Sequence, residues 1–228
     1  MQSNVPQGCL PLALFVVLLF LLPLFLADVM LSALGRLGLS PQTTMLAAIG
    51  IFAGSMINIP IRRIERQQPF DAAACRFYGL QRFFPGQSCQ QQHTILAVNV
   101  GGCLIPCAIA VYELIRIAGH GPGPLGLALT AVGINVWICY RLAQPIANVG
   151  IAMPALVPAF AAAACAVLLY WDMAPPIAFC AGVLGPLIGA DLLHLKEIEK
   201  INTGVASIGG AGTFDGIVLS GLLATLLA

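Results

Sequence analysis

Two consecutive runs, VGIAMPALVPAFAAAACAVLLYW at residues 149–171 and APPIAFCAGVLGPLIGADLLHL at residues 174–195, contain a single charged side chain, Asp191. A helix needs about 20 mostly apolar residues to cross the hydrocarbon core of a bilayer. Both runs are long enough to do so. The sequence therefore predicts a pair of consecutive membrane-spanning helices here.

The rest of the chain has the same apolar character. Of its 228 residues, 59% are hydrophobic and 8% are charged, whereas a soluble domain has roughly 25% charged residues. Together with a mean hydropathy of +0.94, this composition indicates an integral membrane protein surrounded by lipids. The net charge of +1 offers no electrostatic footprint for nucleic acid, which we exclude as a partner.

Proline, glycine or charged residues divide the chain into about seven apolar runs. They lie at approximately 10–27, 42–61, 94–118, 124–140, 149–171, 174–195 and 205–228. These runs predict an all-α polytopic bundle in which residues 1–228 form one transmembrane domain, with a polar loop at about 62–92.

Lysine and arginine are concentrated after the second, fourth and sixth runs. They are Arg62, Arg63, Arg66, Arg76, Arg82, Arg141, Lys196 and Lys200, against Arg36 and Arg116 at the other ends of the runs. By the positive-inside rule, the polar loop and the N-terminus are expected in the cytoplasm.

The polar loop contains part of a possible metal set, formed by Cys75, Cys89 and His93. A tetrahedral zinc site needs a fourth ligand and closely spaced pairs, which the loop lacks. We therefore expect neither a metal nor another cofactor.

Two carboxylates stand inside apolar runs, where a charge is costly and usually marks function. Asp191 comes about 15 residues after Pro176, and Asp215 comes about 13 residues before the C-terminus. On consecutive antiparallel helices, which rise about 1.5 Å per residue, the two would lie at similar depth. We expect them to face one another, in direct contact or through one water.

This match requires that residues 203–212, TGVASIGGAG, are not a regular helix. Their four glycines weaken a helix and permit positive φ. We predict a re-entrant or unwound segment followed by a half-helix that begins near Thr213. Irregular backbone at membrane depth lines a water-filled cavity or is buried in protein, so a wet cavity beside Asp215 is expected.

A structural interpretation stays open for the same residues. Both aspartates can be helix caps or packing partners among small residues. His194 is expected at an interface rather than as a base, and hydrogen bonding between helices is the default role for Asn58 and Asn99. Glu113, near the end of a run, is expected to reach water.

Several motifs together resemble the DUF1614 family of prokaryotic multi-pass membrane proteins. They are GSMINIP (54–60), NVGG (99–102), GIAMPAL (150–156), IGADL (188–192) and SIGGAGTFDG (207–216). The resemblance covers nearly the whole chain and implies a prokaryotic inner (cytoplasmic) membrane location. It does not imply an activity, because the family is named for its unknown function.

A weaker resemblance is to the intramembrane aspartyl proteases of the presenilin and signal-peptide-peptidase class. Those enzymes pair aspartates on consecutive helices, one in a Gly-x-Gly-Asp motif, and have a Pro-Ala-Leu motif nearby. This chain has Gly189-Ala190-Asp191 and Asp215, and its Pro154-Ala155-Leu156 precedes the aspartates instead of following them. The resemblance implies that Asp191 and Asp215 are catalytic and that the substrate is a transmembrane protein or peptide.

For this reading, substrate contacts are expected at Pro154, Ala155, Leu156 and at the glycines Gly209, Gly210 and Gly212. A glycine-rich edge can pair with an extended substrate strand. Asp191, among leucine and isoleucine, is expected to hold the shared proton, and Asp215, at a half-helix N-terminus, to be the anion.

Two other classes of function remain. Broken helices with a carboxylate at membrane depth also form cation or proton sites in secondary transporters. Asp191, Asp215, Asn58 and Asn99 would then carry protons or bind an ion. A non-catalytic scaffold that binds other membrane helices through its glycine faces is the third hypothesis.

Overall fold

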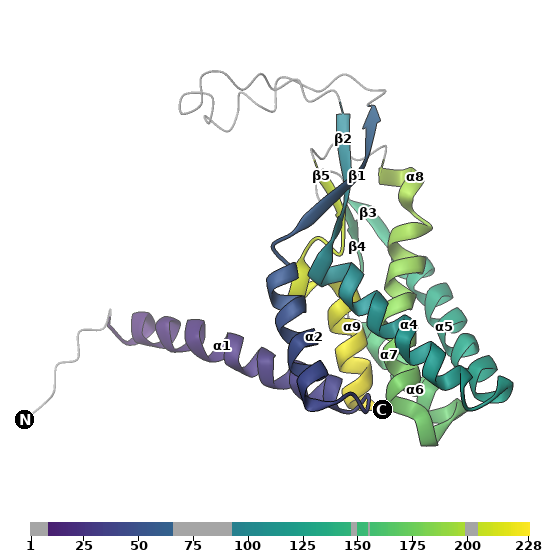
Figure 1. Cartoon of the computed structure of the whole chain (residues 1–228). Coiled ribbons are helices and arrows are strands. Elements are labelled where there is room, and N and C mark those ends of the chain that lie inside the picture. The colour runs from purple at the N-terminus through teal and green to yellow at the C-terminus, as the bar shows by residue number, and fades with distance from the viewer. Residues whose placement is uncertain (1–8, 66–92, 147–149, 155, 199–204) are drawn as a thin grey trace, which may run out of the picture.

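The computed structural model describes residues 9–65, 93–146, 150–154, 156–198 and 205–228. It confirms the predicted all-α fold: apolar helices form a bundle with a small sheet at one end (Figure 1). In this part of the chain, three helical stretches are long and apolar enough to cross a membrane: Val100–Ala118, Pro122–Leu142 and Trp171–Glu197. Shorter apolar helices lie at Leu24–Gly35, Leu156–Leu169 and Gly216–Leu227.

The helices follow the predicted apolar runs. They are α1 (Cys9–Gly35), α2 (Pro41–Gly54), α4 (Ile105–Ala118), α5 (Pro122–Leu142), α6 (Leu156–Leu169), α7 (Ala174–Gly185), α8 (Leu195–Ile198) and α9 (Gly216–Leu227). Local signals fix several ends. Ser40 caps α2 by accepting a hydrogen bond from the Thr43 N–H at 3.2 Å, and Pro41 takes the first helical position.

The sheet was not predicted. Strand β1 (Asn58–Glu65) is antiparallel to β2 (His93–Asn99), whose other edge pairs in parallel with β5 (Val205–Ile208). A second antiparallel pair is formed by β3 (Gln144–Ile146) and β4 (Gly150–Ala152). The apolar runs at 42–61 and 94–118 are therefore helical over only part of their length. Isoleucine-rich β1 and β-branched positions in β2 favour strands, and Pro60 lies at a bulge where no ladder hydrogen bond is needed.

Helix α7 lies at the centre of the bundle and packs against α4, α5, α6 and α9. Most of its side chains are small and fully buried, including Ala178, Cys180 and Ala181. A Cβ on Gly182 would stand 2.7 Å from the Ser220 carbonyl oxygen of α9, so α7 and α9 touch through their backbones. This close contact holds α7 beside α9. Asp191 lies in the segment that continues α7, and Asp215 directly precedes α9.

Two arginines fasten the opposite end of the bundle. Arg36, after α1, donates from Nη1 to the Leu226 carbonyl of α9 at 2.9 Å. Arg116 donates to the Leu37 carbonyl and to Glu113, whose Oε2 is 2.9 Å from Nη1. The expectation that Glu113 reaches water was wrong. Its side chain is 1% exposed, because Arg116, one helical turn later, neutralises it inside the bundle.

Candidate functional site

Asp191 and Asp215 line one small cavity near the sheet end of the bundle. Its volume is about 100 Å³, which is large enough to hold water. The other lining residues are Ile151, Met153, Pro186, Ala190, Gly216 and Ile217. The fold thus brings the two aspartates together from different elements. Their contact through one water stays a prediction.

Asp215 is the N-cap of α9. With φ −69° and ψ 148°, its backbone is extended, and its Oδ1 accepts a hydrogen bond from the Ile217 N–H at 3.0 Å. The other oxygen, Oδ2, accepts one from the Ala211 N–H at 3.3 Å. Two backbone donors and the positive end of a helix dipole all favour the ionised carboxylate. The capping role and a role as the anion of a pair are therefore compatible.

Asp191 lies in a π-helical segment, Pro186–Leu192, that continues α7. Pro186 has no N–H to donate, and the register lengthens, as the Leu193 N–H donating to the Ile188 carbonyl at 3.0 Å shows. Among the described residues, no hydrogen bond reaches the Asp191 carboxylate. The two carboxylates of the cavity therefore stand in unlike surroundings.

Among the described residues, His194 forms no hydrogen bond with the carboxylate of Asp191 or Asp215. It is buried, its Nδ1 lies 3.0 Å from the Gly189 carbonyl oxygen, and its ring centroid is 4.9 Å from that of Tyr140. The ring thereby braces the π-helical segment against α5. This agrees with the expectation that His194 is not a base.

The broken segment before α9 consists of β5, a glycine turn and one 3₁₀ turn at Gly212–Phe214. Gly209 (φ +69°) and Gly212 (φ +63°) adopt the left-handed conformation that glycine permits. A Cβ on Gly102 would overlap the Gly209 carbonyl, and one on Gly212 would stand 2.5 Å from the Ser55 Cβ. Gly209 and Gly212 thus pack closely against other parts of the protein, whereas Gly210 is exposed.

A hydrogen-bond network joins this segment to the C-terminal end of α2 and the start of the third apolar run. Asn99, fully buried, donates from Nδ2 to the Ser55 carbonyl at 2.8 Å and to Asn58 Oδ1 at 3.1 Å, and its Oδ1 accepts from the Gly102 N–H at 2.7 Å. Ser207 Oγ donates to Asn58 Oδ1 at 2.6 Å. Asn58 and Asn99 do form hydrogen bonds, but the expectation that these bonds join helices was wrong: the two residues lie in β1 and β2 and connect the strands to the end of α2 and to β5.

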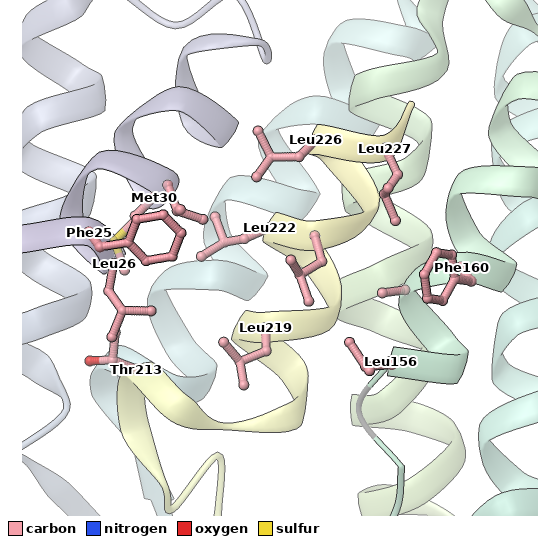
Figure 2. A pocket seen from close by; sticks show the side chains of 13 residues that line it. Phe25, Leu26, Met30, Leu156, Phe160, Thr213, Leu219, Leu222, Leu226 and Leu227 are labelled. Atoms are coloured by element: carbon pink, nitrogen blue, oxygen red, sulfur yellow. The ribbon is translucent and has the colours of Figure 1, made fainter. Parts of the chain in front are cut away.

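The Pro154-Ala155-Leu156 motif lies between two cavities. Met153, directly before it, lines the aspartate cavity, whereas Leu156 lines an apolar groove of about 460 Å³ between α1, α6 and α9 (Figure 2). Pro154 is exposed, and Ala155 lies outside the described residues. Thr213, whose Oγ1 is 2.9 Å from Ser55 Oγ, also lines the groove.

Sequence reasoning did not identify the apolar walls of the aspartate cavity. Ile151 lies in β4 and Met153 follows the end of this strand, which was not expected; both residues line the cavity. Their only sequence signal is the short apolar stretch before Pro154. Of the partial metal set in the polar loop, Cys75 and Cys89 lie outside the described residues.

The family comparison agrees with the motifs. Residues 52–227 match the model of a family described as "Protein of unknown function (DUF1614)". No curated protein and no solved structure matches the chain. Because the match covers most of the sequence, the chain belongs to the DUF1614 family.

Proposed function

We propose that this protein is an intramembrane aspartyl protease in which Asp191 and Asp215 hydrolyse a peptide bond of a membrane-embedded substrate. One observation carries the proposal: two carboxylates from separate broken helices line the same cavity of about 100 Å³. Paired carboxylates that share a proton can activate a water between them. Placing two carboxylates inside a membrane also costs free energy, and a catalytic role would explain why the protein keeps them there.

The unlike surroundings of the two aspartates suggest their roles. Asp215, with two backbone N–H donors, is the base that takes a proton from the attacking water. Asp191, without such donors in the described part of the chain, gives its proton to the carbonyl oxygen as the tetrahedral intermediate forms. Collapse of this intermediate breaks the C–N bond, and the amine leaves with the proton returned through the pair.

A protease of this kind must admit its substrate from the side, out of the lipid. The apolar groove between α1, α6 and α9 (Figure 2) supports such a path, because it includes Leu156, three residues after Met153, and Thr213, two residues before Asp215. The substrate class we propose is a transmembrane protein or peptide. Pairing of an extended substrate with the glycine-rich edge at 204–212 stays a prediction.

Proton- or cation-coupled transport is the second candidate. Both aspartates lie at breaks in helices, as the charged sites of secondary transporters do. The hydrogen bonds disfavour an ion site that includes the asparagines, since Asn58 Oδ1 accepts two hydrogen bonds and Asn99 Oδ1 accepts one from a backbone N–H. A proton carried by Asp191 and Asp215 is the form of transport that these contacts leave open.

We propose that the sheet end of the bundle and the N-terminus face the cytoplasm of a prokaryotic cell, in its inner membrane. Arg62 and Arg63 on β1, Arg141 at the end of α5 and Lys196 in α8 are all exposed at this end (Figure 1). Arg116, at the other end, is paired with Glu113. Labelling of single cysteines placed at Arg63 and at His120 from either side of intact cells tests this orientation.

Vesicles containing the purified protein test the function. A hydrophobic reporter helix is added, and in parallel a proton or sodium gradient is imposed. We expect cleavage by the wild type and its loss in Asp191→Asn and Asp215→Asn, with no ion flux. Asp172→Asn, which changes an exposed acid outside the cavity, is the control and should cleave normally. Flux that depends on Asp191 and Asp215, without cleavage, would overturn the proposal.

A further inference from the structure

The walls of the aspartate cavity are apolar apart from the two carboxylates. Ile151 and Ile217 are branched at Cβ and stiff, and Pro186 and Ala190 have no rotatable side chain. Met153 is the one long, unbranched side chain among the described lining residues, and methionine adapts its shape to the space around it. Met153 is therefore the lining side chain whose length most affects the space in the cavity.

Met153 covers the residue next to Asp215. Its Cε lies 3.9 Å from the position that a Cβ on Gly216 would take, and Gly216 begins α9 directly after Asp215. The Met153 side chain thus packs over the bare backbone of Gly216, and the two residues line the cavity together beside the capping carboxylate. How far the Met153 side chain extends over Gly216 affects how large a group can lie next to Asp215.

We infer that Met153 and Gly216 determine substrate specificity by admitting only a small residue, such as glycine, alanine or serine, beside the scissile bond. This inference rests on the proposed proteolysis. A cavity of about 100 Å³ that also holds the attacking water favours a small side chain beside the scissile bond over leucine or phenylalanine, as long as Met153 keeps its place over Gly216. The preferred substrates are membrane segments with a small residue at the cleavage point.

Two substitutions at this contact change the size of the cavity in opposite directions. Met153→Ala removes the atoms that cover Gly216 and enlarges the space. Gly216→Ala adds one methyl group, which the 3.9 Å spacing accepts as ordinary van der Waals contact. Gly216 does not have positive φ, and alanine is a good residue inside a helix. Met45→Ala truncates an exposed methionine of α2 that lines neither the cavity nor the groove and is the matched control.

The first experiment uses reporter helices that differ only in one residue at the cleavage point: alanine, valine, leucine or phenylalanine. Products are identified by mass spectrometry. The wild type should cleave the alanine reporter at least about tenfold faster than the leucine reporter, as pocket fit allows. Met153→Ala should remove most of this difference, and Gly216→Ala should extend the discrimination to valine. Equal profiles for Met153→Ala and Met45→Ala would overturn the inference.

The second experiment measures binding without turnover. The probes are fluorescent apolar peptides with a hydroxyl-bearing, non-cleavable group in place of the scissile amide, carrying either alanine or leucine beside it. The wild type should bind the alanine probe more tightly, and Met153→Ala should equalise the two. Size-dependent binding without cleavage would overturn proteolysis but keep the specificity role. Cleavage with equal binding of both probes would keep proteolysis and overturn the specificity role, and neither binding nor cleavage would overturn both.

Discussion

Asp191 and Asp215 end up in one cavity by two different kinds of helix break. At Asp215 the chain is interrupted by a strand and a glycine turn, and a new helix begins; the carboxylate accepts hydrogen bonds from the Ile217 N–H of this helix and from the Ala211 N–H before it. At Asp191 the helix is never interrupted but is widened into a π-helical segment after Pro186. The first break stabilises its aspartate with backbone donors, and the second leaves its aspartate without them. The same residue type thus lies in two different hydrogen-bonding environments, which is the basis of the different roles that we propose for the two aspartates.

The largest expected effect comes from removing either charge. Asp191→Asn and Asp215→Asn should each reduce proteolysis by at least about a hundredfold, and the double variant should be no worse, because residues that act as a unit are not additive. Activity should fall on both sides of a pH optimum set by the pair, since one shared proton is required. Initial rates across pH for the three variants check this. A pH profile that survives unchanged in one variant would contradict proton sharing.

The next largest effect tests the contact that holds the glycine turn before Asp215. Gly102→Ala places a methyl group against the Gly209 carbonyl, so the backbones must separate. Overpacking of this kind costs about 1–3 kcal/mol and should lower the melting temperature and the activity together. Gly133→Ala on α5, where nothing lies within 4 Å of the new Cβ, is the control and should raise stability slightly. Unaltered melting of Gly102→Ala would show that the turn is not packed there.

A third prediction concerns the buried asparagine that connects the strands to the helices. Asn99→Ala removes three hydrogen bonds and leaves the Gly102 N–H without its acceptor. An unsatisfied buried group costs about 1–3 kcal/mol, which thermal unfolding in detergent would detect. Thr130→Ala, which loses one exposed hydrogen bond to the Gly126 carbonyl of its own helix, is the control and should have little effect.

The smallest effect separates capping from catalysis at Asp215. Asp215→Ala loses the N-cap and should destabilise the protein by about 1 kcal/mol, whereas Asp215→Asn keeps a good capping side chain and should melt like the wild type. Asp191→Ala, which removes no hydrogen bond among the described residues, should not be destabilised in this way. A large loss of stability in Asp215→Asn would mean that the ionised carboxylate is structural.

Local composition alone predicted much of this protein. The apolar runs predict membrane helices because length and hydrophobicity suffice for that inference. The four glycines of 203–212 predict the break before α9, because glycine weakens helices wherever it lies. Asp191 and Asp215 were singled out as costly charges in apolar surroundings. None of these predictions depends on which segments meet.

Tertiary structure decided the rest. β5 pairs with β2 across more than a hundred residues of sequence, and no local signal specifies that partner. Glu113 is buried because Arg116, which also donates to the Leu37 carbonyl, pairs with it in the packed bundle. Met153 lines the same cavity as Asp215 because the segment that follows β4 passes there, although the two residues are far apart in the chain. Residue chemistry thus selected the reactive side chains, while long-range packing determined their neighbours and the space between them.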